Sequence, residues 1–161
     1  MFDYYDQRWA AEGLYYTTTF VAEEQSHIIG FVEVYLTDIE EHLCGVVYYV
    51  GVHPSWRRKG IGRSLVRYAE KYFMQFGASF SLASTVADNF VSRNFFSKLG
   101  YVEYTVDDLR RMIGRWKTSV LLRKLWIWGD DDIIMIKPLY QSTSVSRVKL
   151  LKMLFRGEPL S

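Results

Sequence analysis

Residues 45–76 read GVVYYVGVHPSWRRKGIGRSLVRYAEKYFMQF, and this stretch decides the fold class. Its first part, residues 45–52, is almost wholly apolar, which is typical of a strand that is buried on both faces. The strand is expected to end at His53-Pro54, because proline cannot donate to a central sheet ladder. Over residues 60–76 the apolar side chains recur at helical spacing. The stretch therefore predicts a buried strand, a turn and an amphipathic helix.

The segments on either side continue this alternation of strands and helices. Further strands are predicted over residues 17–23, 27–36, 79–86, 101–106 and 132–139, and helices over residues 3–12, 89–99, 107–125 and 142–156. A polar turn is expected at 38–42, and Ser144 is a candidate cap for the last helix. The apolar stripe of helix 107–125 is expected to contain Leu109, Met112, Ile113, Trp116 and Val120. The alternation predicts an α/β sandwich with a mixed sheet.

Length and composition favour one globular domain over residues 1–161, with a core at about 14–139 and a helical extension at 140–161. Apolar residues make up 49% of the chain, and 20 basic residues against 18 acidic ones leave a net charge of +2. This near balance argues against nucleic acid as a partner. The three histidines lack the spacing of metal ligands, so no metal is expected.

The single cysteine, Cys44, cannot form an internal disulfide and is expected to be a small apolar filler in a reducing compartment. The first residues lack a signal-peptide pattern, and no apolar run approaches the roughly 20 residues of a membrane-spanning helix. A soluble cytoplasmic protein is therefore expected.

The turn between the strand and the helix combines glycines with positive charge. Glycines let the backbone approach a ligand closely, and a helix N-terminus offers unpaired N–H groups to an anion. The candidate phosphate-binding residues are Arg57, Arg58, Lys59, Gly60, Ile61, Gly62 and Arg63. The spacing excludes a P-loop, and Leu65 interrupts the glycine pattern of a dinucleotide fold. A basic loop that merely joins two elements remains the alternative at this point.

Two blocks of sequence resemble the GNAT superfamily of N-acetyltransferases. Residues 57–62 (RRKGIG) resemble its [QR]-x-x-G-x-[GA] signature, and residues 89–101 (NFVSRNFFSKLGY) resemble its N-x-x-[AS]-x-x-[LF]-Y-x-x-x-G-[FY] pattern. The resemblance covers residues 14–106, and strand 132–139 less clearly. It implies a mixed, mostly antiparallel central sheet, splayed between the family's fourth and fifth strands, with helices on both faces and extra C-terminal helices.

The resemblance also implies a site for acetyl-coenzyme A. The pyrophosphate would lie on the turn amides from Arg58 to Arg63, and the pantetheine arm would pair with Val50, Gly51 and Val52. Asn89 matches a residue that hydrogen-bonds the arm. The positions that flank the cofactor on the second helix are Phe96, Ser97 and Lys98. Lys98 either reaches the 3′-phosphate or is a solvated helix lysine.

The catalytic residues are where the chain departs from the family pattern. Phe96 stands where the family has the tyrosine that protonates the leaving thiolate, and strand 45–52 carries no carboxylate. The remaining candidates are Glu33 as a base, Tyr48 by its position on that strand, and Ser84 as a residue that orients a water. Because the alternation of strand 27–36 does not settle its direction, Glu33 is expected to be exposed to solvent. The family's first strand and first helix, which line the acceptor site, are expected to be missing.

The resemblance predicts an acetyl-coenzyme A-dependent N-acetyltransferase, in which an amine of a protein N-terminus, a lysine or a small molecule attacks the thioester directly. The alternative is an acyl-coenzyme A sensor or interaction module with weak or no catalysis. The basic, amphipathic segment 107–128 is either a solvated face or a contact for an anionic membrane, an acidic substrate or a second subunit of a homodimer.

Overall fold

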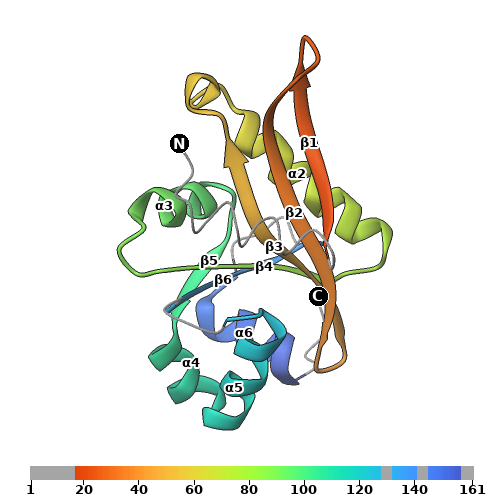
Figure 1. Cartoon of the computed structure of the whole chain (residues 1–161). Coiled ribbons are helices and arrows are strands. Elements are labelled where there is room, and N and C mark those ends of the chain that lie inside the picture. The colour runs from red at the N-terminus through yellow and green to blue at the C-terminus, as the bar shows by residue number, and fades with distance from the viewer. Residues whose placement is uncertain (1–16, 128–131, 141–144, 157–161) are drawn as a thin grey trace.

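The computed structural model describes residues 17–127, 132–140 and 145–156, whose strands form one six-stranded sheet (Figure 1). The strands are β1 (Thr18–Glu24), β2 (His27–Ile39), β3 (His42–Val52), β4 (Phe80–Thr85), β5 (Val102–Thr105) and β6 (Ile133–Pro138). Their order in the sheet is β1-β2-β3-β4-β6-β5. Only the β3–β4 pair is parallel among these strands. The predicted mixed, mostly antiparallel sheet is confirmed.

The helices divide between the two faces of the sheet (Figure 1). They are α2 (Ile61–Gln75), α3 (Phe90–Lys98), α4 (Val106–Ile113), α5 (Arg115–Lys124) and α6 (Arg147–Arg156), and a short 3₁₀ helix covers Pro54–Trp56. Side chains of α2 and α3 pack on one face, and those of α4, α5 and α6 pack on the other. The arrangement is the two-faced sandwich that alternating strands and helices favour.

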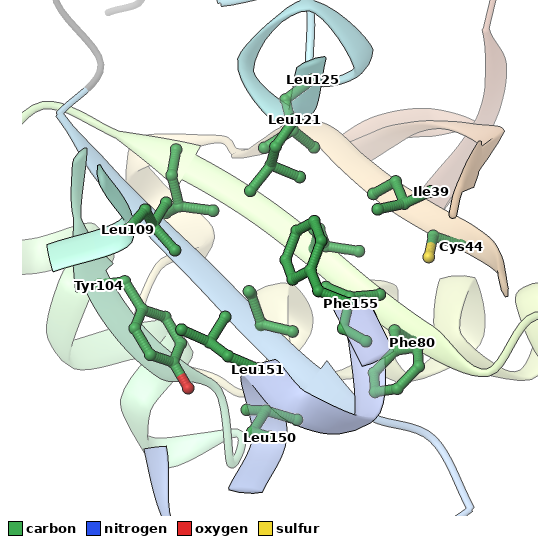
Figure 2. Packing of buried hydrophobic residues seen from close by; sticks show 14 of the residues in the cluster. Ile39, Cys44, Phe80, Tyr104, Leu109, Leu121, Leu125, Leu150, Leu151 and Phe155 are labelled. Atoms are coloured by element: carbon green, nitrogen blue, oxygen red, sulfur yellow. The ribbon is translucent and has the colours of Figure 1, made fainter. Parts of the chain in front are cut away.

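Two hydrophobic cores lie on opposite faces of this sheet. The first core contains side chains from β2–β6 and α4–α6, including Tyr104, Leu121 and Leu150, which are all 0% exposed (Figure 2). The second core packs α2 and α3 against the sheet through residues such as Val34 and Phe73. Because side chains alternate between faces along a strand, core membership shows which way each strand residue points.

The hairpin between β2 and β3 is tighter than expected. The polar turn predicted at 38–42 is present but shorter, because Ile39 and His42 pair across the hairpin and only Glu40 and Glu41 lie between them. The buried side chain of Ile39, which belongs to the first core, holds the end of β2 in the sheet. Cys44 is 0% exposed, as expected of a filler, and burial raises the pKa of its thiol to about 12.

The predicted helix 107–125 is also wrong, because Gly114 divides it into α4 and α5. Gly114 has φ 85° and ψ 160°, which lies far from helical geometry. The break changes the direction of the second helix, so that Trp116, expected in the apolar stripe, is 76% exposed. Leu109 remains in the first core, where the stripe placed it.

The last helix begins later than the predicted residue 142. It starts at Arg147, and the Ser146 hydroxyl oxygen accepts the Lys149 N–H at 3.2 Å as an N-cap does. The predicted cap, Ser144, and the predicted helix 3–12 lie outside the described residues.

Gly45 of β3 leaves room for the ring of Phe73 on α2. A Cβ atom built on Gly45 would lie 2.1 Å from the Phe73 ring, which is 0% exposed. We expect Gly45→Ala to lower the free energy of unfolding by roughly 1–3 kcal/mol or more, because the ring cannot yield in a packed core. Urea denaturation would measure the loss. Gly62→Ala is the control: its Cβ would meet ring atoms at an ordinary 3.4 Å, so stability should not fall. Equal stability of Gly45→Ala and the unmodified protein would contradict this packing.

Candidate active site

The sheet opens between β3 and β4. These strands pair only at Cys44–Phe80, Gly45–Ser81 and Val46–Leu82, although β3 runs on to Val52 and β4 to Thr85. The edge of β3 that follows Val46 is therefore not paired with β4. Such an opening offers backbone N–H and C=O groups to an extended ligand, as an exposed strand edge does. The predicted splay, and the predicted cofactor residues Val50, Gly51 and Val52, lie here.

A β-bulge in β3 sits at the start of this opening. Glu33 of β2 is opposite Tyr49, whereas the next residue, Val34, is opposite Val47, so Tyr48 is the extra residue. Tyr48 packs on the first core. Tyr49 lies opposite Glu33 and therefore shares its face of the sheet. The bulge thus directs two consecutive tyrosines to the face covered by α4–α6.

The three predicted catalytic residues share this face. Glu33 lies two residues before Tyr35, which belongs to the first core, and Tyr48 packs on that core. Ser84 lies two residues after Leu82, another member of the first core. The sheet therefore presents all three side chains on one side, beside the splay.

Glu33 is buried, and the expectation that it would be exposed to solvent is wrong. Its side chain is 1% exposed, and Oε2 has no hydrogen-bond partner among the described residues. Burial penalises the charged carboxylate and raises the pKa of Glu33 to about 7. Both faces of β2 are covered by packed side chains, so the sequence of the strand does not alternate between apolar and polar residues in a way that would reveal which face Glu33 is on. A carboxyl group with this pKa can accept a proton near neutral pH.

Aromatic rings form a cluster next to Glu33, and we call Tyr35, Tyr48, Tyr49 and Trp126 the aromatic cluster. Tyr35 stacks on Trp126 at 4.0 Å between ring centroids, with an interplanar angle of 13°. The Tyr48 ring meets Trp126 edge-on at 5.4 Å and Tyr49 edge-on at 4.9 Å. Local sequence patterns do not predict that Trp126 contacts these tyrosines, because the loop after α5 places it beside them.

The turn after β3 has the geometry of an anion site. Arg58 and Gly60 both have left-handed backbone conformations, with φ 65° and 83°. Gly60 is the N-cap of α2 and has no side chain to accept from the first N–H groups of the helix. The first turn of α2 contains no acidic residue. The amides of this turn, with the helix dipole, therefore favour a negatively charged group.

The basic side chains of the turn differ in their contacts. Arg57 Nε donates to the Val52 carbonyl oxygen at 3.1 Å, which ties the turn to the end of β3. Lys59 Nζ lies 4.5 Å from the centroid of the Trp56 ring. Arg58 and Arg63 are exposed, and Ile61 and Gly62 begin the helix itself. Each predicted residue of the turn therefore lies around one helix N-terminus.

The second block forms α3, and its residues fall into two groups. Asn89 is the N-cap, since its Oδ1 accepts the Ser92 N–H at 3.1 Å, which leaves its Nδ2 group as a donor. Ser97 and Lys98 are exposed at the other end of α3. Phe96 is 3% exposed and packs against Tyr101 at 5.0 Å in the second core. Burial leaves Phe96 little surface for a cofactor.

A clamp that the sequence did not suggest holds the loop before α3. Arg93 donates to Glu103 through Nε at 3.0 Å and Nη2 at 2.7 Å, and through Nη1 to the Ala87 carbonyl at 2.6 Å. The Ala87 N–H donates to Asp132 Oδ1 at 2.7 Å. The hydrogen bonds from Arg93 lower the pKa of Glu103. The clamp thus fixes the end of β4 and the start of α3, which border the splay.

Two further features are absent from the part of the chain that the structure describes. No group of three or more His, Cys, Asp or Glu side chains in residues 17–127, 132–140 and 145–156 is arranged to hold a metal ion. No helix over these same residues is both long and apolar enough to cross a membrane.

Comparison with known proteins points to one family. The model of the acetyltransferase (GNAT) family matches residues 1–101, which is more than half of the chain. Two curated proteins of Arabidopsis thaliana, the probable N-acetyltransferases HLS1-like and HLS1, are each 44% identical over 62 residues. These matches cover 37% of this chain and 15% of each relative, so the chain corresponds to a small part of their length.

Solved structures share the fold. The ribosomal-protein-S18-alanine N-acetyltransferase of Escherichia coli has a TM-score of 0.58 at 16% identity, over 90% of this chain and 83% of that one. N-acetylglutamate synthase of Neisseria gonorrhoeae, in complex with coenzyme A and N-acetyl-glutamate, has a TM-score of 0.56 at 17% identity, over 76% and 26%. With the splayed sheet and the glycine turn in place, the match to the family over residues 1–101 shows that this chain belongs to the GNAT acetyltransferase family.

Proposed function

We propose that the protein transfers an acetyl group from acetyl-coenzyme A to a primary amine. The observation that carries the proposal is the unpaired edge of β3 beside β4, which lies between the uncapped N-terminus of α2, directly after β3, and the buried carboxyl group of Glu33 on the neighbouring strand β2. An anion site, an open strand edge and a base with a pKa of about 7 are the parts that amine acetylation needs. The family membership supports the same activity.

The described residues fit coenzyme A. Apart from Gly60 and its two chain neighbours, none of these residues has an atom within 4 Å of the position that a Cβ on Gly60 would take, so the backbone is open to a phosphate on that side. Arg58, Lys59 and Arg63 would surround the pyrophosphate, and the edge of β3 from Val50 to Val52 would pair with the pantetheine arm. Asn89 Nδ2 would donate to the arm. Acetyl-coenzyme A supplies an activated acetyl thioester, and no metal ion is required.

Glu33 would serve as the general base. At neutral pH a substantial fraction of its carboxyl group is ionised, because its pKa is about 7. The carboxylate would take a proton from the attacking amine as the new C–N bond forms and the C–S bond breaks. Backbone N–H groups at the β3 edge would stabilise the negative charge that develops on the thioester oxygen. Tyr48 would line the acceptor side, and Ser84 would orient a water molecule on the same face.

The leaving thiolate would take its proton from solvent. Phe96 has no proton to give, and it lies in the second core. This feature favours the second candidate function, an acyl-coenzyme A sensor with weak or no catalysis. The buried Oε2 of Glu33, which has no partner among the described residues, favours the enzyme, because a sensor has no use for a group whose burial costs stability.

The proposal extends to the amine acceptor, the cellular compartment and the oligomeric state. One fold relative is named for acetylating an alanine of a ribosomal protein, and another for making N-acetylglutamate. Both protein N-termini and small amines are therefore acceptors to test. The reduced, buried Cys44 is compatible with the cytoplasm. The exposed Trp116 on α5 is a candidate contact in a homodimer through the C-terminal helices.

Titration calorimetry with acetyl-coenzyme A, followed by thiol release against a panel of amines and peptides, tests the proposal. Binding with release on at least one acceptor is the expected result. Binding without release on any acceptor would favour the sensor. An absence of binding would overturn the assignment of the site.

A further inference from the structure

We propose that the aromatic cluster selects the acceptor, and that the preferred acceptor is a primary amine joined by a short linker to an aromatic ring. The inference rests on the proposed function and adds the substrate class to it. It begins with an unusual backbone conformation at Trp126, which has φ 54°. Bulky residues rarely adopt this left-handed region, because the side chain crowds the backbone.

The conformation of Trp126 belongs to the end of α5. The Trp126 N–H donates to the Arg123 carbonyl at 3.1 Å, and the Ile127 N–H donates to the Leu122 carbonyl at 3.0 Å. These two bonds form a Schellman motif, and the position that Trp126 occupies usually carries glycine. A tryptophan there is strained, and such strain persists where surrounding contacts hold it, often at functional sites.

The contacts that hold Trp126 are rings. Tyr35 stacks on the indole at 4.0 Å, and Tyr48 meets it edge-on at 5.4 Å. The Tyr35 hydroxyl donates to the Lys124 carbonyl at 3.0 Å, which fastens the stack to the last turn of α5. Tyr35 is 7% exposed, whereas Trp126, Tyr48 and Tyr49 are partly exposed. A partly exposed aromatic surface, held together by ring contacts, therefore lies beside the bulge.

The carboxyl group of Glu33, next to this surface, favours a positively charged group at the other end of the acceptor. Glu33 lies opposite Tyr49 in the sheet and shares the face of the aromatic cluster. Its Oε2 is buried and unpartnered among the described residues. A carboxylate near aromatic faces attracts an ammonium group and disfavours a second carboxylate. An amino acid acceptor, whose α-carboxylate would approach Glu33, is therefore disfavoured, and an arylalkylamine meets both features at once.

The test compares 2-phenylethylamine with butylamine and phenylalanine, by titration calorimetry in the presence of coenzyme A and by initial rates of thiol release with acetyl-coenzyme A. We expect 2-phenylethylamine to bind at least about tenfold more tightly than butylamine, because both carry the same ammonium group and only the first has a ring that packs on the aromatic cluster. Phenylalanine should bind more weakly than 2-phenylethylamine. Equal affinities of 2-phenylethylamine and butylamine would overturn the inference without any variant.

The variant for this test is Trp126→Gly, with Trp116→Ala as the matched control. Glycine suits the left-handed conformation at residue 126, and Trp116 is an exposed tryptophan near the start of α5, away from the cluster. We expect Trp126→Gly to remove most of the preference, about tenfold in Kd, and Trp116→Ala to keep it. An unchanged preference in Trp126→Gly would also overturn the inference. Coenzyme A affinity, which the N-terminus of α2 sets, reports whether each variant is folded.

The readouts separate this inference from the proposed function. Selective binding of 2-phenylethylamine without thiol release would contradict the proposed acetyltransferase activity and support the aromatic acceptor site. Equal thiol release with butylamine and 2-phenylethylamine would support the proposed acetyltransferase activity and contradict the preference for an aromatic acceptor.

Discussion

Replacement of Glu33 with glutamine should lower kcat/KM for amine acetylation by about 10²–10³-fold, which is the contribution of a general base. Glutamine keeps the shape of the side chain but cannot accept the proton. The unmodified enzyme should gain activity as the pH rises through about 7, where Glu33 ionises, and the variant should lack this step. Initial rates from about pH 5.5 to about pH 9, with acetyl-coenzyme A saturating, would show both effects.

The same replacement should make the fold more stable at high pH. The folded-state pKa of Glu33, about 7, lies above its ordinary value of 4.5. Such a group binds its proton more tightly when folded, so its contribution to stability is full below pH 4.5 and is lost as the pH rises through 7. Glu33→Gln avoids that loss, which is roughly 2–3 kcal/mol above about pH 8. Urea denaturation at about pH 5 and about pH 8.5 would measure the difference.

Glu103→Gln is the matched control for the stability measurement. Its hydrogen bonds from Arg93 lower the pKa of Glu103, so its contribution is present at neutral pH and is lost as the pH falls. This variant should therefore be less stable than the unmodified protein at about pH 8.5, the opposite sign from Glu33→Gln.

If Glu33→Gln kept full acetylation activity, Glu33 would not be the general base.

Gly60→Asp should raise the Kd for coenzyme A by about 100-fold or more, because the new carboxylate would stand at the proposed position of the pyrophosphate. Apart from residue 60 and its two chain neighbours, no described residue has an atom within 4 Å of the position of a Cβ at residue 60, so a clash is not the cause. An acidic residue at the N-terminus of a helix also suits the helix dipole. Titration calorimetry would measure the affinity.

Gly77→Asp supplies the comparison at the other end of the same helix. Gly77 also has φ 83°, and apart from Gly77 and its two chain neighbours no described residue has an atom within 4 Å of a Cβ there, so the backbone strain of the substitution is matched. We expect its coenzyme A affinity to stay within a few-fold of that of the unmodified protein. A Gly60→Asp protein that bound coenzyme A as tightly as Gly77→Asp would show that the pyrophosphate lies elsewhere.

The sequence was informative where one local pattern determines the structure. The apolar run at 45–52, the proline after it and the helical spacing from residue 60 predicted β3, the turn and α2 within a few residues. The mixed, mostly antiparallel character of the sheet followed from the alternation of elements and the family resemblance. The break at Gly114 was missed, because a single glycine within a helical pattern is usually tolerated.

The catalytic side of the site depends on contacts between distant segments, which local patterns do not encode. The burial of Glu33 requires cover on both faces of β2, and its alternation with Phe31 and Tyr35 was compatible with either direction. The stack of Tyr35 on Trp126 joins residues on β2 and after α5. Nor did the sequence mark Tyr48 as a bulge, since every residue from 46 to 50 suits a strand.

The sheet that separates the two cores also separates two kinds of specificity. The proposed cofactor-binding elements, α2 and α3, pack in the second core, and the proposed acceptor surface packs with α4–α6 on the first. Substitutions on distant, unconnected sites have nearly additive effects. A lineage of such proteins, or a laboratory selection, is therefore free to exchange its acceptors by changing side chains on the α4–α6 face of the sheet while its affinity for coenzyme A stays the same.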